Sequence, residues 1–218
     1  MTWIPNRRAL VAGLGATLAA LTTGARPLRA QSAARGDGPV RHDQDRWMDD
    51  LPSKHRVFVD TASRQGGQDG VVFASNILNV TESAYGVKPT DVGLIICFRH
   101  QSTPFGYNEA MWVKYGQYFS ERLELPKPVS VNPVNPAGPS EEGARTIATL
   151  ADKGVVIAVC AQATRGMAGR IATATGGSQE AILKELMANP VRHGRFVPAG
   201  VVAATHAQEY GYTQLSCA

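Results

Sequence analysis

The chain has 218 residues, of which 44% are hydrophobic, 7% aromatic and 18% charged. This length and apolar content suit one globular domain with a leader, and they exclude a disordered or fibrous protein. The formal charge of +4 comes from four arginines in residues 1–34, because the other 18 Lys and Arg balance the 18 Asp and Glu, and a general nucleic-acid-binding surface is therefore not supported.

Residues 1–34 are predicted to be an export signal. Arg7 and Arg8 directly precede a weakly apolar stretch over about 9–25, and small residues follow it at 30–34. Paired arginines, a mildly hydrophobic core and positive charge near a cleavage region resemble a twin-arginine (Tat) signal. The alternative, a transmembrane anchor, needs about 20 strongly apolar residues, and this stretch is shorter and weaker. We therefore expect export to the periplasm, with no stable membrane anchor after cleavage.

The segment that follows, residues 35–53, is polar and punctuated by Gly and Pro, so we expect a flexible lead-in before a folded domain over 54–218. The first strand of this domain is predicted at 55–60, and Gly66-Gly67 is expected to break the structure after it. Residues 68–85 then have helical spacing. The packed face of this helix is predicted from its apolar stripe, Phe73, Ile77, Val80 and Ala84.

Two continuous apolar runs, 92–98 and 155–160, predict strands that are buried on both faces. Between them, residues 105–124 have helical spacing. The prolines of 126–139 exclude a regular helix and predict a long extended loop. The next helix is expected to begin at Ser140, which can cap it.

The rest of the chain alternates in the same way, with helices predicted at 161–174, 178–188 and 200–210. Another apolar stretch begins at Phe196 and Val197, and a last short strand is predicted at 212–217. Strands that alternate with helices are typical of a doubly wound α/β protein. We predict a three-layer α/β sandwich with a mostly parallel central sheet of about five strands. In such sheets, ligands bind at the carboxyl ends of the strands.

The three cysteines, Cys97, Cys160 and Cys217, each lie at or near the carboxyl end of a predicted strand. We therefore expect all three thiols at the functional edge of the sheet. Their number is odd, so at least one is free, paired between chains or bound to another group. No CxxC, HExxH or Cys/His cluster with zinc spacing is present, and we expect neither a metal nor another cofactor.

A family resemblance is carried by several segments in a defined order. They are NILNVTESAYG (76–86), CFRH (97–100), NEAMWVKYG (108–116), GVVIAVCAQAT (154–164) and VPAGVVAATHAQEYGYT (197–213). Together they resemble the DsrE-like proteins of the sulfur-relay group. The resemblance implies a compact α/β fold, a homo-oligomer and, as in some members, a persulfide on the cysteine after the central strand, here Cys160. The chain departs from the sulfur-relay members in its Tat-type leader and its proline-rich segment.

Cys160 is the first candidate catalytic residue. A cysteine between a buried strand and a helix N-terminus is suited to form a thiolate, because backbone N–H groups and the helix dipole favour negative charge there. The alternative is that Cys160 is a small buried hydrophobic residue. Arg99 and His100 follow the 92–98 strand and are expected to assist, with the arginine holding an anion and the histidine exchanging a proton.

Further candidates are the substrate-binding residues Asn76, Asn79 and Arg165. Arg165 and Arg170 follow Cys160 within the next helical turns and would add positive potential near it. Cys97 and Cys217 are possible redox partners. In an oxidising compartment, a Cys97–Cys160 or a Cys160–Cys217 disulfide is a further alternative.

Functions from different classes are compatible with these residues. The first is an exported sulfurtransferase or sulfur carrier, in which Cys160 accepts sulfane sulfur from a small sulfur species or a partner protein. The second is a non-catalytic periplasmic binding or assembly protein that uses the same strand-end crevice. A third interpretation has His100 bind a metal or haem, with His206 as a distant second ligand.

Overall fold

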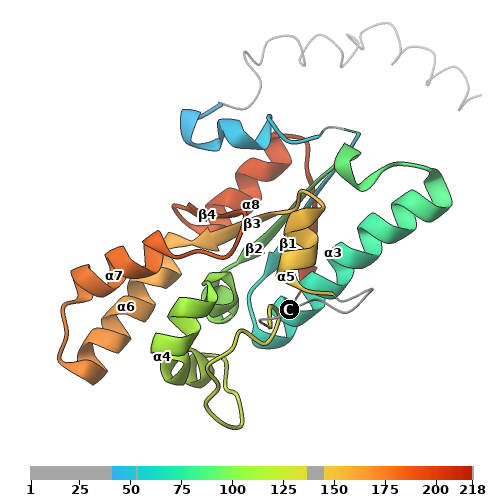
Figure 1. The fold of residues 1–218 in the computed structure, drawn as a ribbon. Coiled ribbons are helices and arrows are strands. Elements are labelled where there is room, and N and C mark those ends of the chain that lie inside the picture. The colour runs from blue at the N-terminus through green and yellow to red at the C-terminus, as the bar shows by residue number, and fades with distance from the viewer. Residues whose placement is uncertain (1–40, 53, 137–144, 218) are drawn as a thin grey trace, which may run out of the picture. The chain divides into compact units, whose positions relative to one another are not determined.

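The computed structural model describes residues 41–52, 54–136 and 145–217, all within the unit Arg41–Ala218. Its centre is a five-stranded sheet in which every neighbouring pair is parallel, with the strand order β4-β3-β2-β1-β5. The strands are β1 (His55–Thr61), β2 (Val92–Phe98), β3 (Val156–Cys160), β4 (Gly194–Val197) and β5 (Thr213–Cys217). The predicted three-layer α/β sandwich with a parallel sheet is confirmed (Figure 1).

Helices cover both faces of the sheet. The α-helices are α3 (Arg64–Tyr85), α4 (Glu109–Arg122), α5 (Ile147–Asp152), α6 (Ala161–Thr175), α7 (Gln179–Ala188) and α8 (Gly200–Glu209). Short 3-10 helices are η1 (Asp43–Met48), η2 (Pro89–Asp91) and η3 (His100–Gly106). One core lies between the sheet and helices α3 to α7, and the other lies between the sheet, η1 and α8. In none of the described helices is there a stretch long and apolar enough to cross a membrane.

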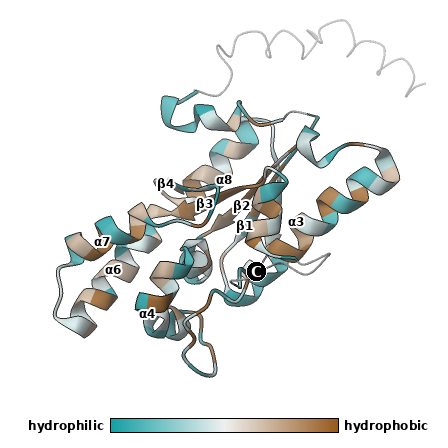
Figure 2. Ribbon diagram, in the orientation of Figure 1, coloured by the Kyte–Doolittle hydropathy of each residue, from teal (hydrophilic) through white to brown (hydrophobic). Residues whose placement is uncertain are grey.

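The central strand β2 is buried along its whole length, as its uninterrupted apolar sequence predicts. Leu94 and Ile96 point into the core below α3, while Ile95 and Cys97 point into the core below α8. Successive side chains of a strand alternate between faces, so a strand covered on both sides has to be apolar at every position. Figure 2 shows the same contrast, with brown central strands and teal on the outer parts of the helices.

The expected break at Gly66-Gly67 is wrong, because both glycines belong to the first turn of α3. Ser63 caps this helix, and its side-chain oxygen accepts a hydrogen bond from the Gly66 N–H at 2.8 Å. A Cβ on Gly66 would overlap the Cys217 carbonyl, and one on Gly67 would lie 2.5 Å from the Phe105 ring. The glycines therefore permit close packing rather than end an element.

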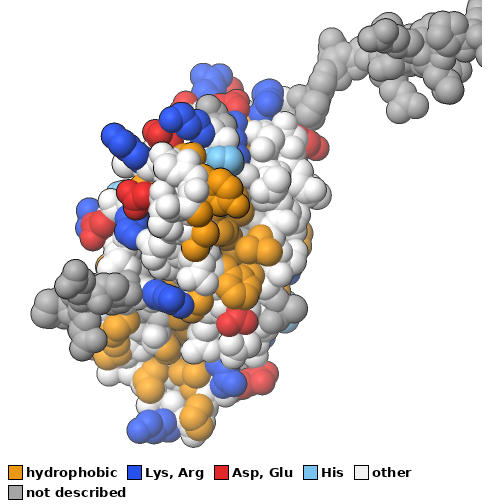
Figure 3. Space-filling model, turned by 90° about the vertical axis from the view of Figure 1, so that its right-hand side faces the viewer, with side chains coloured by type: hydrophobic (Ala, Val, Ile, Leu, Met, Phe, Trp, Pro, Cys, Tyr) orange, Lys and Arg blue, Asp and Glu red, His pale blue; other side chains and the backbone are white. Residues whose placement is uncertain are grey.

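The packed face of α3 also differs from the prediction. Phe73 and Val80 are 39% and 53% exposed, whereas Val71, Ala74 and Leu78 are buried. Both sets have helical spacing, but the second contains the small side chain that lets the helix approach the sheet. Ile77 of the first set is partly buried against the core, so the exposed apolar stripe consists of Phe73 and Val80. Figure 3 shows hydrophobic side chains gathered on the face of the molecule that includes α3.

The expected flexible lead-in, residues 35–53, is described only over 41–52, and this part packs on the domain. Met48 is fully buried, and its carbonyl accepts a hydrogen bond from the Tyr212 hydroxyl at 2.8 Å. The polar composition concealed this anchor, because one buried apolar side chain in a short 3-10 helix leaves no periodic pattern.

Two helix boundaries differ from the prediction. The segment 105–124 divides into η3 and α4, because Pro104 belongs to η3 and the Asn108 side chain caps a new helix. Helix α5 begins after Thr146, whose hydroxyl accepts from the Thr149 N–H at 3.2 Å. The predicted start at Ser140 lies outside the described residues, and the prolines of 126–136 form no helix or strand, as expected.

A pair of glycine substitutions tests the packing of the α3 N-terminus. We expect Gly66→Ala to lower the free energy of unfolding by about 1–3 kcal/mol, because the new methyl group has to displace backbone. The matched control is Gly166→Ala in α6, where an added Cβ would meet no atom within 4 Å. Gly166→Ala should raise the free energy of unfolding by about 0.5–1 kcal/mol, because alanine has a higher helix propensity than glycine. Urea unfolding of both variants gives the values, and equal effects would contradict the packing described here.

Candidate functional site

The candidate site lies at the carboxyl ends of the central strands. The parallel register places Asp60 of β1 opposite Cys97 of β2, and Cys97 opposite Ala158, two residues before Cys160 in β3. Asp60, Cys97 and Cys160 share the sheet face that α8 covers, since they occupy the same alternating set of positions. The predicted edge therefore brings chemically active side chains together.

Asp60 and Arg99 form a bidentate ion pair at this edge. The Nε and Nη2 atoms of Arg99 donate to the two carboxylate oxygens of Asp60 at 2.6 and 2.8 Å. Asp60 is 5% exposed, so the pair is largely shielded from water. The bonded carboxylate raises the pKa of Arg99 above its ordinary value. The charge of Arg99 is therefore neutralised by Asp60, and this bond fixes the start of η3. The expected role of Arg99 in holding an external anion is not seen in this arrangement.

Cys160 occupies the turn between β3 and α6. Its sulfur accepts a hydrogen bond from the Ala163 N–H at 3.4 Å, so the thiol caps the helix. Its carbonyl accepts from the Thr164 hydroxyl at 2.9 Å, and that hydroxyl is bonded in turn to the buried Tyr107. The N-terminus of a 15-residue helix favours negative charge on the sulfur.

A pocket of about 520 Å³ opens beside Cys160. The Cys160 side chain forms part of its wall, although the residue is only 7% exposed. The titratable side chains that line it, apart from the thiol, are all basic: Arg99, His100, Arg122 and Arg170. Met167 and Val201 supply apolar wall. Among the described residues no Asp or Glu lines this pocket, so it suits a ligand that is partly apolar and negatively charged.

Cys97 lies on the same face as Cys160 but below the surface. Its thiol is fully buried, and burial together with the charge of Asp60 raises its pKa far above the ordinary range. Gly200 at the start of α8 covers it, and a Cβ there would lie 3.1 Å from the Cys97 sulfur. Cys97 is therefore held as an inert thiol.

Cys217 departs from the expectation of one shared edge. It lies at the end of β5 as predicted, but its side chain points into the core on the α3 side of the sheet. Burial raises the pKa of its thiol. All three cysteines are free, so neither disulfide of Cys160 is present.

The remaining predicted residues lie apart from the pocket. Asn76 is exposed on α3, and Asn79 accepts a hydrogen bond from the Lys153 ammonium group at 2.8 Å. Arg165 is exposed on α6 and does not line the pocket. All three residues lie on helices that pack against the core, but their side chains are exposed to solvent away from this pocket.

The interpretation of His100 and His206 as joint ligands finds no support in their positions. His100 is exposed at the rim of the Cys160 pocket, whereas His206 lines a different pocket. There its Nδ1 lies 2.6 Å from the Asp45 carboxylate, and its ring stacks on His42. The described residues contain no group of three or more His, Cys, Asp or Glu side chains arranged to hold a metal ion.

Sequence reasoning missed Arg122, which lies in the last turn of α4. It is separated from Cys160 by 38 positions, and its helical spacing places it in line with the apolar residues Met111, Tyr115 and Phe119, so nothing in the pattern marks it as a pocket residue. Only the packing of α4 near α6 brings it to the pocket. Arg170 was easier to find, because it follows Cys160 by ten positions on the same helix.

Comparison with known proteins adds no identification. No protein-family model, curated protein or solved structure matches the chain. The resemblance to DsrE-like proteins therefore stays a prediction from the sequence segments.

Thiol labelling of the native protein tests the different environments of the cysteines. With iodoacetamide at about pH 8, we expect Cys160 to react first, because its side chain lines an open pocket that the reagent can enter. The raised pKa values of Cys97 and Cys217 keep those thiols protonated at this pH, so they should react only after unfolding in urea. Peptide mass mapping over time gives the order. Labelling of Cys97 in the native protein as fast as Cys160 would contradict the assignment.

Proposed function

We propose that this protein accepts sulfane sulfur as a persulfide on Cys160 and acts as a sulfurtransferase or sulfur carrier. The observation that supports this most is the position of the Cys160 sulfur, which caps α6 and lines a pocket with basic side chains. A helix N-terminus and nearby cations stabilise both the attacking thiolate and the persulfide anion that follows.

The proposed reaction needs no external oxidant or reductant. The Cys160 thiolate attacks the outer sulfur of a donor persulfide, R–S–SH, and a new S–S bond forms. The donor's own S–S bond breaks, and R–S⁻ leaves with the electron pair. Cys160 then carries the S–SH group, and the reverse of this step passes the sulfur to an acceptor thiolate.

Two other residues of the pocket have distinct parts in this proposal. His100 is exposed at the rim and can give a proton to the departing thiolate. Arg99 acts as a positioning residue, because its bond to Asp60 holds the start of η3, where His100 lies.

The alternative function is a non-catalytic periplasmic binding or assembly protein. It is favoured by the apolar stripe on α3, where Phe73 and Val80 are exposed together with Tyr85 at 77%. A homo-oligomer would bury such a surface. Export by a Tat-type leader is part of both proposals.

Sulfur loading of the full chain separates these functions. Reduced protein is mixed with a small persulfide, and its intact mass is measured before and after treatment with dithiothreitol. We expect wild type to gain one sulfur atom that reduction removes, and Cys160→Ser to gain none. The matched control is Cys217→Ser, since Cys217 is 6% exposed against 7% for Cys160; this variant should load as wild type does.

A wild-type protein that gains no sulfur while it remains folded would contradict the sulfur-handling function and favour the binding function. Equal loading of Cys160→Ser and Cys217→Ser would also exclude Cys160 as the acceptor.

A further inference from the structure

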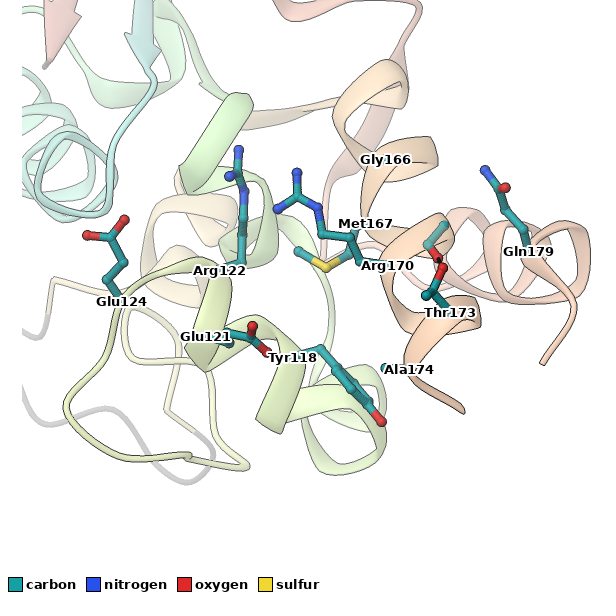
Figure 4. Close-up of a pocket in the computed structure, with 11 residues that line it drawn as sticks. Tyr118, Glu121, Arg122, Glu124, Gly166, Met167, Arg170, Thr173, Ala174 and Gln179 are labelled. Carbon is teal, nitrogen blue, oxygen red and sulfur yellow. Dashed lines mark hydrogen bonds between the residues drawn. The ribbon is translucent and has the colours of Figure 1, made fainter. Parts of the chain in front are cut away.

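Arg122 and Arg170 form a pair of neighbouring cations on facing helices. Arg122 extends from α4 and Arg170 from α6, and both line the Cys160 pocket. Both also line a second, adjoining pocket of about 660 Å³. Figure 4 shows the two guanidinium groups directed to the same part of this second pocket. The two arginines therefore lie at the boundary that the two pockets share.

Neither guanidinium has an ionic partner within the described part of the chain. No carboxylate there lies within 4 Å of Arg122 or Arg170, and Glu121 and Glu124 line only the second pocket. Partial burial and the positive charge of Arg170 lower the pKa of Arg122, and Glu124 offsets only part of this. Arg99 differs from these two arginines, because it forms an ion pair with Asp60.

Two adjacent cations without a partner repel each other, and a bound anion removes that repulsion. A planar carboxylate is a suitable anion, since arginine presents two parallel N–H donors that match its two oxygens. The pair therefore has the chemistry of a carboxylate-binding subsite.

The size of the pocket favours an organic ligand over a small inorganic one. Pockets for organic ligands occupy roughly 300–1,000 Å³, and the pocket beside Cys160 measures about 520 Å³. Met167 and Val201 line it together with the basic groups, so a carbon skeleton has apolar wall to contact.

We propose that the sulfur donor or acceptor is an organic thiol with a carboxylate, which Arg122 and Arg170 bind while its sulfur reaches Cys160. This inference rests on the proposed function and names the substrate class of that site. The arginines are binding residues here and do not take part in the S–S exchange.

Two donors that differ only in the carboxylate test this inference. N-acetylcysteine persulfide carries the group, and N-acetylcysteamine persulfide lacks it. We expect wild type to load Cys160 at least about tenfold faster from the first donor, the size of one charge-assisted contact. The double variant Arg122→Gln/Arg170→Gln should lose this preference, and Arg122→Lys/Arg170→Lys should recover part of it.

The matched control is Arg165→Gln, which removes an exposed arginine of the same helix that lines neither pocket. It should keep the full preference, which shows that loss of an exposed arginine from α6 does not by itself remove the preference. The inference is overturned if wild type loads equally from both donors, or if the double Gln variant keeps the preference.

A binding measurement separates failure of the subsite from failure of the sulfur chemistry. N-acetyl-S-methylcysteine has a carboxylate but no reactive thiol, and its affinity is measured by calorimetry on wild type and the double Gln variant. If no donor loads Cys160 but this ligand binds wild type and not the variant, the subsite stands and the proposed function fails. If the ligand binds neither protein, or both equally, the subsite is overturned.

Discussion

Parallel pairing of the three central strands is the constraint from which the site follows. Because β1, β2 and β3 run in one direction, their carboxyl ends meet at one edge of the sheet, and the chain turns into a helical segment after each of them. The register sets Asp60 opposite Cys97, which allows Asp60 to bond Arg99 two positions further on. The same edge sets the Cys160 sulfur at the start of α6.

At this edge of the sheet, the thiols differ in their access to the pocket and the arginines differ in their ion-pair partners. Of the two thiols on the α8 face, α8 seals Cys97, whereas Cys160 lines a pocket. Of the arginines around that pocket, Arg99 is neutralised by Asp60, whereas Arg122 has no carboxylate partner within ion-pair distance in the described chain. One thiol and a local excess of positive charge thus remain available to a ligand, which is the physical basis of the proposed sulfur chemistry.

The sequence predicted the layers of the fold better than the details of the site. Uninterrupted apolar runs such as 92–98 identify buried parallel strands, and the position of Cys160 after such a run located the pocket. Periodicity could not decide between two helical stripes on α3, because both Phe73 and Ala74 belong to sets with the same spacing. It also could not reveal Arg122, which reaches the pocket only through tertiary packing, or the partner that occupies Arg99.

Whether Cys160 carries sulfur can be measured on protein isolated from its own cells without reductant. Peptide mass mapping before and after reduction identifies any sulfur bound to each of the three cysteines. We expect a reducible extra sulfur atom on Cys160 in a fraction of the molecules, with Cys97 and Cys217 as plain thiols. Cys160 found only as an unmodified thiol under conditions that preserve persulfides, or the extra sulfur on Cys97 instead, would contradict this expectation.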